Sequence, residues 1–202
     1  MSEPPNIAAV ILAAGASSRM GRPKALLEFE GATLLDRQIL LFSGVCRKVV
    51  CVLGYAVEEV AAGARRAAEA VVVLNPRPER GQLSSLQSGL RAVEGSDAVF
   101  FLPVDGPGVH AETLQRLIAE WGNAEVKPPF TIPQHAGRHG HPVLMDGSWV
   151  AAMLALPAEA SARELVRAQA ERNRYVEVED ERVATDVDTP AEYEMLVKGV
   201  RF

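Results

Sequence analysis

The 202-residue chain has only two cysteines, Cys46 and Cys51, and neither belongs to a CxxC or Cys/His pattern. A disulfide framework is thereby excluded and structural zinc is disfavoured, so we expect buried thiols in a reducing compartment. The chain also lacks an apolar run near the roughly 18 residues of a membrane span. The apolar run at 7–14 lacks the basic flank and cleavage site of a secretory signal. We therefore expect a cytoplasmic protein with no membrane partner.

A positive charge excess is missing too, because 21 Lys and Arg residues stand against 26 Asp and Glu residues, a formal net charge of -5. A field of this sign repels polyanions, so no nucleic-acid partner is expected. The first 24 residues differ, since Arg19, Arg22 and Lys24 outnumber Glu3. We expect a small anion to bind there.

The apolar runs are short and continuous rather than alternating, which is typical of strands covered on both faces. They occupy residues 7–14, 49–53, 71–74 and 98–102. Apolar residues at helical spacing follow them, for example Leu35, Ile39 and Phe42, and the stripe that contains Trp121 is expected to pack in the core. This β-α alternation predicts an α/β fold: a doubly wound, mostly parallel sheet with helices on both faces, in a single domain over residues 1–202.

The C-terminal part is less regular. We expect a strand at 129–133, a loop at 134–142, helices around 148–155 and 160–170, and a strand at 175–179. The last helix has a clearer signal, because Thr189, Pro190 and Glu192 form a capping box with proline at the first helical position. A helix is therefore predicted to start at Thr189.

Ligands of open parallel sheets bind at the carboxyl ends of the strands, and the segment GASSRMGRPK (15–24) follows the first strand. Glycine lets backbone amides approach an anion, and Arg19 and Lys24 can neutralise phosphate. The spacing matches neither GxxxxGK[ST] nor GxGxxG, which disfavours Walker ATPases and dinucleotide-binding dehydrogenases. A phosphate-binding loop and a flexible, solvated loop both stay open.

Carboxylates follow two other predicted boundaries. Asp105 lies just beyond the apolar run at 98–102, between Pro103 and Pro107, and Asp186 and Asp188 precede the last helix. Such carboxylates suit Mg²⁺, which takes few protein oxygens and completes its shell with phosphate and water. The alternatives are an Asx turn at Asp105 and a helix-dipole role for one of the other two.

The imidazoles of His135, His139 and His141 form an H-x3-H-x-H pattern. A zinc site is disfavoured, because the segment is glycine-rich and lacks a Cys or acidic partner at the usual spacing. We expect His135 to face solvent.

Six segments together resemble one family, the nucleotidyltransferases similar to molybdenum cofactor cytidylyltransferase and guanylyltransferase. They are LAAGASSRMGRPK (12–24), NPRPERGQLSSLQSGL (75–90), PVDGP (103–107), GRHGHPVL (137–144), SARELV (161–166) and DVDTPAEY (186–193). They occur in the family's order over nearly the whole chain.

The resemblance implies a Rossmann-like nucleotidyltransferase, dependent on Mg²⁺, that passes NMP from an NTP to a phosphorylated acceptor. It implies catalytic roles for Arg19, Lys24 and Asp105, and metal ligation by Asp105 and Asp188. The nucleotide-binding residues that it implies are Leu12, Ala13, Ala14, Gly15, Arg19, Lys24, Asn75, Gly81 and Ser85. His141 would shape the acceptor site. The LAAG form favours CTP, molybdopterin is the favoured acceptor, and the product would pass to a molybdoenzyme or its chaperone.

The chain departs from the family pattern at Val104, Gly106 and His139, so the acceptor stays open. One alternative is cytidylyl or uridylyl transfer to a sugar or polyol phosphate. Another is a noncatalytic nucleotide-binding partner in cofactor insertion. An NAD-dependent oxidoreductase is disfavoured, because its glycine fingerprint is missing.

Overall fold

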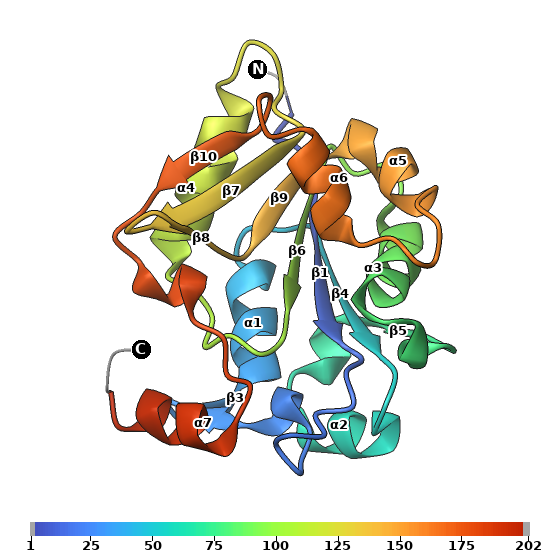
Figure 1. Cartoon of the computed structure of the whole chain (residues 1–202), viewed down its shortest axis with the longest axis vertical. Coiled ribbons are helices and arrows are strands. Elements are labelled where there is room, and N and C mark those ends of the chain that lie inside the picture. The colour runs from blue at the N-terminus through green and yellow to red at the C-terminus, as the bar shows by residue number, and fades with distance from the viewer. Residues whose placement is uncertain (1–2, 200–202) are drawn as a thin grey trace.

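The fold is organised around β1 (Ile7–Ala13), a strand whose residues are all buried. It lies in a sheet of order β10-β7-β9-β6-β1-β4-β5, parallel to β4 and β6, while β9 is antiparallel to β6 and β7 (Figure 1). We describe residues 3–199 of a computed structural model. The other strands of the sheet are β4 (Lys48–Leu53), β5 (Val71–Leu74), β6 (Ala98–Pro103), β7 (Phe130–His135), β8 (Arg138–His139), β9 (Val143–Asp146) and β10 (Arg174–Glu177).

Helices connect the parallel strands, as right-handed crossovers require. The connecting helices are α1 (Leu34–Ser43), α2 (Val57–Gly63), α3 (Gln82–Leu90) and α4 (Ala111–Gly122). Helices α5 (Val150–Leu154) and α6 (Ala162–Ala168) lie between β9 and β10, and α7 (Pro190–Val197) follows β10. Helix α3 comes so close to β1 that a Cβ on Gly89 would clash with a methyl group of Val10. Glycine at this position lets the helix and the sheet touch.

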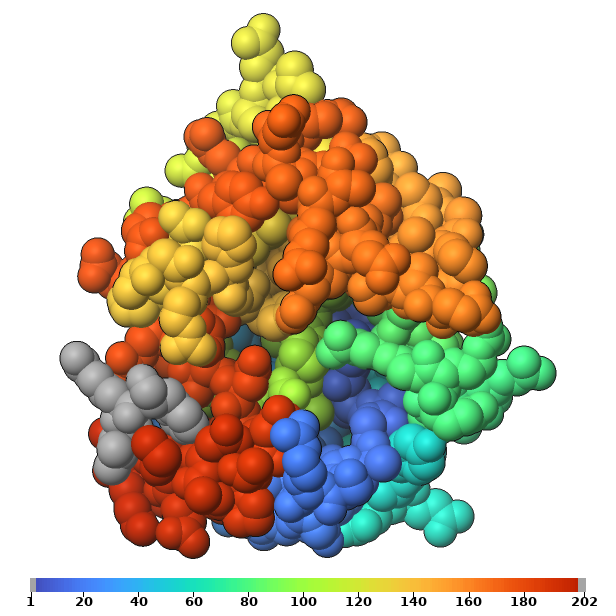
Figure 2. Space-filling model, viewed as in Figure 1, coloured from blue at the N-terminus to red at the C-terminus, as the bar shows by residue number. Residues whose placement is uncertain are grey.

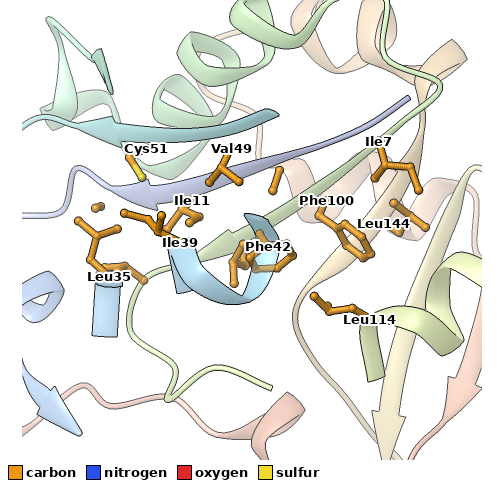
Figure 3. Packing of buried hydrophobic residues seen from close by; sticks show 14 of the residues in the cluster. Ile7, Ile11, Leu35, Ile39, Phe42, Val49, Cys51, Phe100, Leu114 and Leu144 are labelled. Atoms are coloured by element: carbon orange, nitrogen blue, oxygen red, sulfur yellow. The ribbon is translucent and has the colours of Figure 1, made fainter. Parts of the chain in front are cut away.

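Alternate residues of β1 enter two separate cores, because successive side chains of a strand point to opposite faces. Ile11 packs with residues of α1, α2 and α4, and Figure 3 shows part of this cluster. Val10 packs on the other face with α3, α5 and α6. The predicted doubly wound, mostly parallel sheet with helices on both faces is therefore confirmed, and Trp121 is buried in the first core as predicted.

The third apolar run was expected to be covered on both faces, and this is wrong. It forms β5, the last strand of the sheet, so Val71, Val72 and Leu74 stay exposed. The sequence patterns also missed β9 and the hairpin β2 (Glu28–Phe29) and β3 (Ala32–Thr33), which are too short for a periodic signal. The predicted last helix is confirmed, since Thr189 caps α7 through both bonds of a capping box.

Cys51 is buried and Cys46 is partly buried, and both thiols are free. Burial raises the pKa of each thiol to about 12, so both stay protonated and unreactive at neutral pH. Among residues 3–199, no helix has the length and apolar character needed to cross a bilayer.

Candidate active site

A cleft of about 380 Å³ opens where β1, β4 and β6 end. Figure 2 shows the molecule hollowed where the blue N-terminal loop, the green middle segment and the red C-terminal segment meet. The sequence-predicted residues that line the cleft are Leu12, Ala13, Ala14, Gly15, Arg19, Lys24, Gly81, Ser85, Asp105 and Asp188. This position agrees with the rule for ligand sites in open parallel sheets.

The loop after β1 has defined internal bonds. Ser17 adopts a left-handed conformation (φ 50°), and its carbonyl accepts a hydrogen bond from the amide of Met20 at 2.9 Å. The Ser17 hydroxyl accepts a second bond from the amide of Lys24 at 3.0 Å. The loop is therefore a closed turn that aims Lys24 into the cleft, while the Arg19 side chain is 65% exposed.

Asp105 is held at the end of β6 through its backbone. The amide of Val104 donates to the carbonyl of Leu12 at 3.0 Å, and the amide of Val187 donates to the carbonyl of Asp105 at 2.9 Å. Behind it, the fully buried Gln38 donates from Nε2 to the carbonyl of Gly106 at 3.2 Å. The loop is thus attached to β1, to α1 and to the C-terminal segment.

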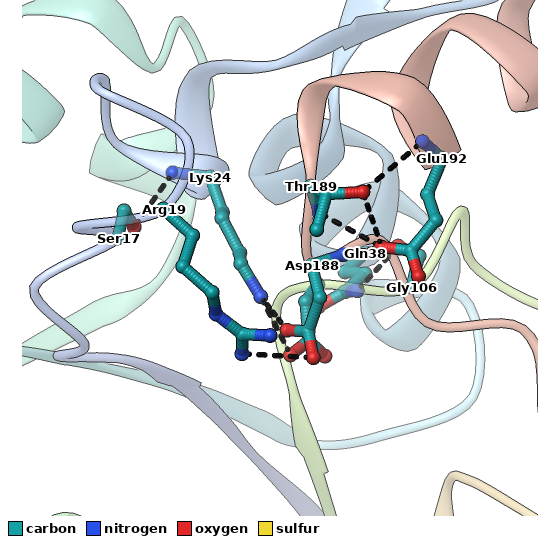
Figure 4. Close-up of polar contacts among 9 residues, drawn as sticks. Ser17, Arg19, Lys24, Gln38, Gly106, Asp188, Thr189 and Glu192 are labelled. Atoms are coloured by element: carbon teal, nitrogen blue, oxygen red, sulfur yellow. Dashed lines mark hydrogen bonds and ion pairs between the residues drawn. The ribbon is translucent and has the colours of Figure 1, made fainter.

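The side chains of four charged residues meet in the cleft (Figure 4). Lys24 Nζ lies 3.2 Å from Asp105 Oδ2 and 2.5 Å from Asp188 Oδ1. Arg19 Nη2 lies 2.9 Å from Asp188 Oδ2. The hydrogen bond from Lys24, with help from Arg19, lowers the pKa of Asp188, so this carboxyl is an anion at neutral pH.

Asp188 reaches this cluster because α7 docks on the N-terminal loop. Val187 and Leu196 pack with Met20, Leu27 and Leu34 in a small apolar cluster separate from the two main cores. In addition, the hydroxyl of Tyr193 donates to the carbonyl of Glu28 at 2.7 Å. This docking brings together side chains that are 164 positions apart in the sequence.

Asp186 is exposed and borders a small cavity next to the cleft. Desolvation raises its pKa, and repulsion from Asp105 and Asp188 adds to the rise. Asp186 therefore interacts electrostatically with Asp105 and Asp188, but it does not line the main cleft with them.

The donor set of the cleft fits a hard divalent cation. Lys24 Nζ, itself a cation, lies between two carboxylates, and Asp105 Oδ1 is buried with no hydrogen-bond partner. No group of three or more His, Cys, Asp or Glu side chains within residues 3–199 is arranged to enclose a metal. A site with two carboxylates leaves the other positions to phosphate and water, which is how Mg²⁺ is usually bound.

Asn75 and His141 do not line the cleft. Asn75 is buried, and its Nδ2 donates to the hydroxyls of Ser84 and Ser85 at 2.9 and 3.0 Å. Asn75 therefore contributes to the cleft indirectly, by binding Ser85, which lines it.

His141 lies behind Asp105, beside a small cavity that it shares with Gln38 and Asp186. Its backbone amide donates to the carbonyl of Val183 at 2.8 Å, and its Nδ1 is buried without a partner. Burial lowers the pKa of the imidazole despite the attraction of Asp105, so the ring is neutral at pH 7.

The other two histidines of the pattern have separate contacts. The His139 ring stacks on Tyr175 with centroids 4.5 Å apart. His135 is half-buried, with Nδ1 2.8 Å from the carbonyl of Val178, so the expectation that it faces solvent is wrong.

Sequence reasoning missed several residues of the site. Tyr55 and Gln82 line the cleft, and Gln38 and Glu192 support its two acidic segments from behind. Tyr55 had a usable signal, since it follows the predicted strand at 49–53. Glu192 also had one, as the last residue of the capping box.

A family model described as "MobA-like NTP transferase domain" matches residues 9–174. The chain belongs to this family. It is thus a nucleotidyltransferase by descent, and the Rossmann-like fold and the resemblance stated from its motifs are confirmed.

Among curated relatives, nicotine blue oxidoreductase of Paenarthrobacter nicotinovorans is 32% identical over 191 residues, covering 92% of this chain and 93% of the relative. Molybdenum cofactor cytidylyltransferase of Escherichia coli K12 is 26% identical over 184 residues, covering 91% of this chain and 92% of the relative. One family therefore contains relatives named for different chemistries.

The solved structure of Rv0371c from Mycobacterium tuberculosis superposes with a TM-score of 0.82 at 28% identity, covering 98% of this chain and 100% of that one. A manganese complex of Rv0371c superposes with a TM-score of 0.79 at 26% identity, covering 96% and 100%. A structural relative thus binds manganese.

Proposed function

We propose that this transferase moves NMP, with CTP the favoured donor, to a phosphorylated acceptor, with molybdopterin favoured, and that Mg²⁺ is required. The reaction would take place in the cytoplasm and release pyrophosphate. The product would pass to a molybdoenzyme or its chaperone. The relative named molybdenum cofactor cytidylyltransferase, which aligns over 92% of its own length, supports the choice of donor and acceptor.

One observation carries the proposal: Lys24, Asp105 and Asp188 meet in one cleft beside a closed, glycine-containing turn. A solvated loop, an Asx turn and a helix-dipole carboxylate would each explain one of these residues alone. None of them explains why one ammonium bridges two carboxylates from distant segments. A site for a metal and a triphosphate explains all three residues.

In the proposed complex, the backbone of Leu12, Ala13, Ala14 and Gly15 lies against the nucleotide, and Gly81 and Ser85 form the part of the cleft wall contributed by the segment at 81–85. Asn75 holds that wall through its bond to Ser85. Lys24 and Arg19 bind the triphosphate. Asp105 and Asp188 hold Mg²⁺, which would supply positive charge to the phosphates, and His141 shapes the acceptor side.

Nucleotidyl transfer needs no general base here, because a phosphate monoester, with a second pKa near 6, is already mostly a dianion at pH 7. An acceptor oxygen forms a bond to the α-phosphorus while the bond to pyrophosphate breaks. The residues of the cleft must screen repulsion between two anions, align them and stabilise charge on the leaving group. Lys24 and Arg19 are both cations that reach the cleft, so they can screen the repulsion and stabilise the leaving group.

The test is to incubate the protein with purified molybdopterin, Mg²⁺ and each NTP in turn, and to identify any dinucleotide by mass spectrometry while measuring pyrophosphate. We expect a cytosine dinucleotide as the main product. Pyrophosphate release with sugar or polyol phosphates, but not with molybdopterin, would move the acceptor to that class. No release with any acceptor would contradict the proposal.

A second candidate function, an oxidoreductase activity, is favoured by the 32% identity to the relative named nicotine blue oxidoreductase. Hydride transfer, however, has no need for two carboxylates bridged by a lysine. Decolorisation of nicotine blue with NADH or NADPH separates the two candidates. If it proceeds equally well in an Asp105→Asn variant, the acidic pair has no part in that activity and the reductase candidate is favoured.

A further inference from the structure

The carboxylate of Glu192 accepts more hydrogen bonds than a helix cap requires. Its Oε2 accepts from the amide and hydroxyl of Thr189, at 2.8 and 3.0 Å, and from the amide of Asp188 at 2.8 Å. In an ordinary capping box, the third helical residue binds only the amide of the capping residue. The additional bond to Asp188 reaches one residue beyond the cap.

The side chain that caps α7 is that of Thr189, not that of Asp188. An aspartate just before a helix normally turns its carboxylate back onto the free amides of the first turn. Here the Thr189 hydroxyl accepts from the amide of Glu192 in the first turn, while the Glu192 carboxylate binds the amides of Asp188 and Thr189 just before the helix (Figure 4). The carboxylate of Asp188 points away from α7 and contacts Lys24 and Arg19 instead.

We propose that Glu192 is a positioning residue: by binding the backbone amide of Asp188, it holds the Asp188 carboxylate in the orientation that a divalent cation in the cleft requires. This inference rests on the proposed function. Residues that orient metal ligands from behind typically change metal affinity by 10- to 100-fold when they are replaced. Glu192 would touch neither the metal nor the nucleotide.

A purely structural cap is the competing explanation, and Thr189 provides the matched control. Thr189→Ala removes the hydroxyl that accepts from the amide of Glu192 at 3.3 Å, and so weakens the same cap. It leaves the bond from the Asp188 amide to Glu192 intact. Glu192→Ala keeps the bond from its own amide to the Thr189 hydroxyl, but it removes the bonds that Oε2 accepts from Thr189, and so weakens the cap, and the bond from the Asp188 amide. Glu192→Gln keeps an acceptor oxygen and is itself accepted in capping boxes.

The experiment titrates the full-length protein and its variants with Mn²⁺, without nucleotide, and counts free Mn²⁺ by electron paramagnetic resonance. We expect Glu192→Ala to weaken Mn²⁺ binding about 10-fold, Thr189→Ala to stay within about twofold of the wild type, and Glu192→Gln to restore most of the affinity. Thermal melting checks that Thr189→Ala and Glu192→Ala lower the midpoint to a similar degree.

Equal losses of Mn²⁺ affinity in Thr189→Ala and Glu192→Ala would overturn the inference, because the cap alone would then explain the effect. If Glu192→Ala does not fold, Glu192→Asp takes its place: it keeps the charge but is one methylene too short to reach the Asp188 amide, and the same loss is expected. A wild-type protein that binds no Mn²⁺ would refute the metal site of the proposed function. Wild-type binding that every Glu192 variant retains would refute only this inference.

Discussion

The two acidic segments of the cleft are fixed in different ways. Asp105 lies two residues beyond the end of β6, whose residues Phe100, Phe101 and Leu102 are buried in the main cores. Asp188 lies on the C-terminal segment, which is held by the small apolar cluster around Leu196 and by a few hydrogen bonds. One carboxylate is therefore placed by the core of the fold, and the other by a local docking contact whose stability can vary independently.

Removing the carboxylate placed by the core should have the largest effect. Asp105→Asn is expected to lower turnover by at least about 100-fold, since it removes a charge that acts on the transition state. The rate of pyrophosphate release at saturating NTP measures this turnover. Asp97→Asn, at the opposite end of the same strand, is the control and should stay within about twofold of the wild type. Equal losses in both variants would mean that β6 tolerates no change, rather than that Asp105 acts in catalysis.

Lys24 bridges the two segments, and its removal should have effects of opposite sign on two ligands. Lys24→Ala is expected to lower turnover and weaken NTP binding by about 10-fold or more, because a phosphate contact is lost. Without nucleotide it should bind Mn²⁺ more tightly, because the ammonium no longer competes for Asp105 and Asp188. Calorimetric titration with NTP and with Mn²⁺ measures the change in affinity for each ligand, with Lys48→Ala as the control. Weaker binding of both ligands would contradict the proposed competition between the Lys24 ammonium and Mn²⁺ for the two carboxylates.

The docking contact can be compared directly with the core. Leu196→Ala should lower the free energy of unfolding by about 2 kcal/mol and Leu114→Ala by about 3 kcal/mol, both within the range for buried leucines. Leu196→Ala should also weaken Mn²⁺ binding, because it loosens the segment that carries Asp188. Leu114→Ala, in the main core, should not. Denaturant titration and Mn²⁺ titration of both variants test this, and equal Mn²⁺ affinities would show that docking does not control the site.

The smallest expected effect is a pH dependence that comes from His141, behind Asp105. Burial lowers its pKa in the folded state, so the unfolded chain binds a proton more readily as the pH falls below about 6.5. The free energy of unfolding should decrease from pH 7 to pH 5 by at most about 1.4 kcal/mol per pH unit from this group. His141→Gln should flatten that slope, whereas His139→Gln should not. Denaturant midpoints at four pH values measure the difference.

The sequence predicts the half of the fold that consists of parallel strands and helices, because these strands are continuous apolar runs and α1, α3 and α4 have periodic apolar stripes. It does not reveal that β5 lies at the edge, since Val71 and Val72 look as apolar as the residues of β1. Strand β9 is equally hidden, because four residues between two loops carry too little pattern. Burial on both faces is decided by strand order, which is a tertiary property.

The candidate site was predictable as a set of residues but not as a geometry. Lys24, Asp105 and Asp188 each have an ordinary local explanation. Only the docking of α7 brings Asp188 beside Lys24. Glu192 was visible as part of a helix cap, yet its bond to the Asp188 amide depends on how the chain enters that cap. Contacts of this kind follow from the folded backbone rather than from residue types.

The account rests on a divalent ion that is shared by the core-placed and the docked carboxylate. A crystal structure with CTP and Mn²⁺, with the metal located by its anomalous scattering, tests it most directly. We predict a peak coordinated by one oxygen each of Asp105 and Asp188 and by phosphate oxygens, with the Lys24 ammonium moved from the carboxylates onto the triphosphate. A metal bound away from both carboxylates, or a nucleotide outside this cleft, would contradict the account.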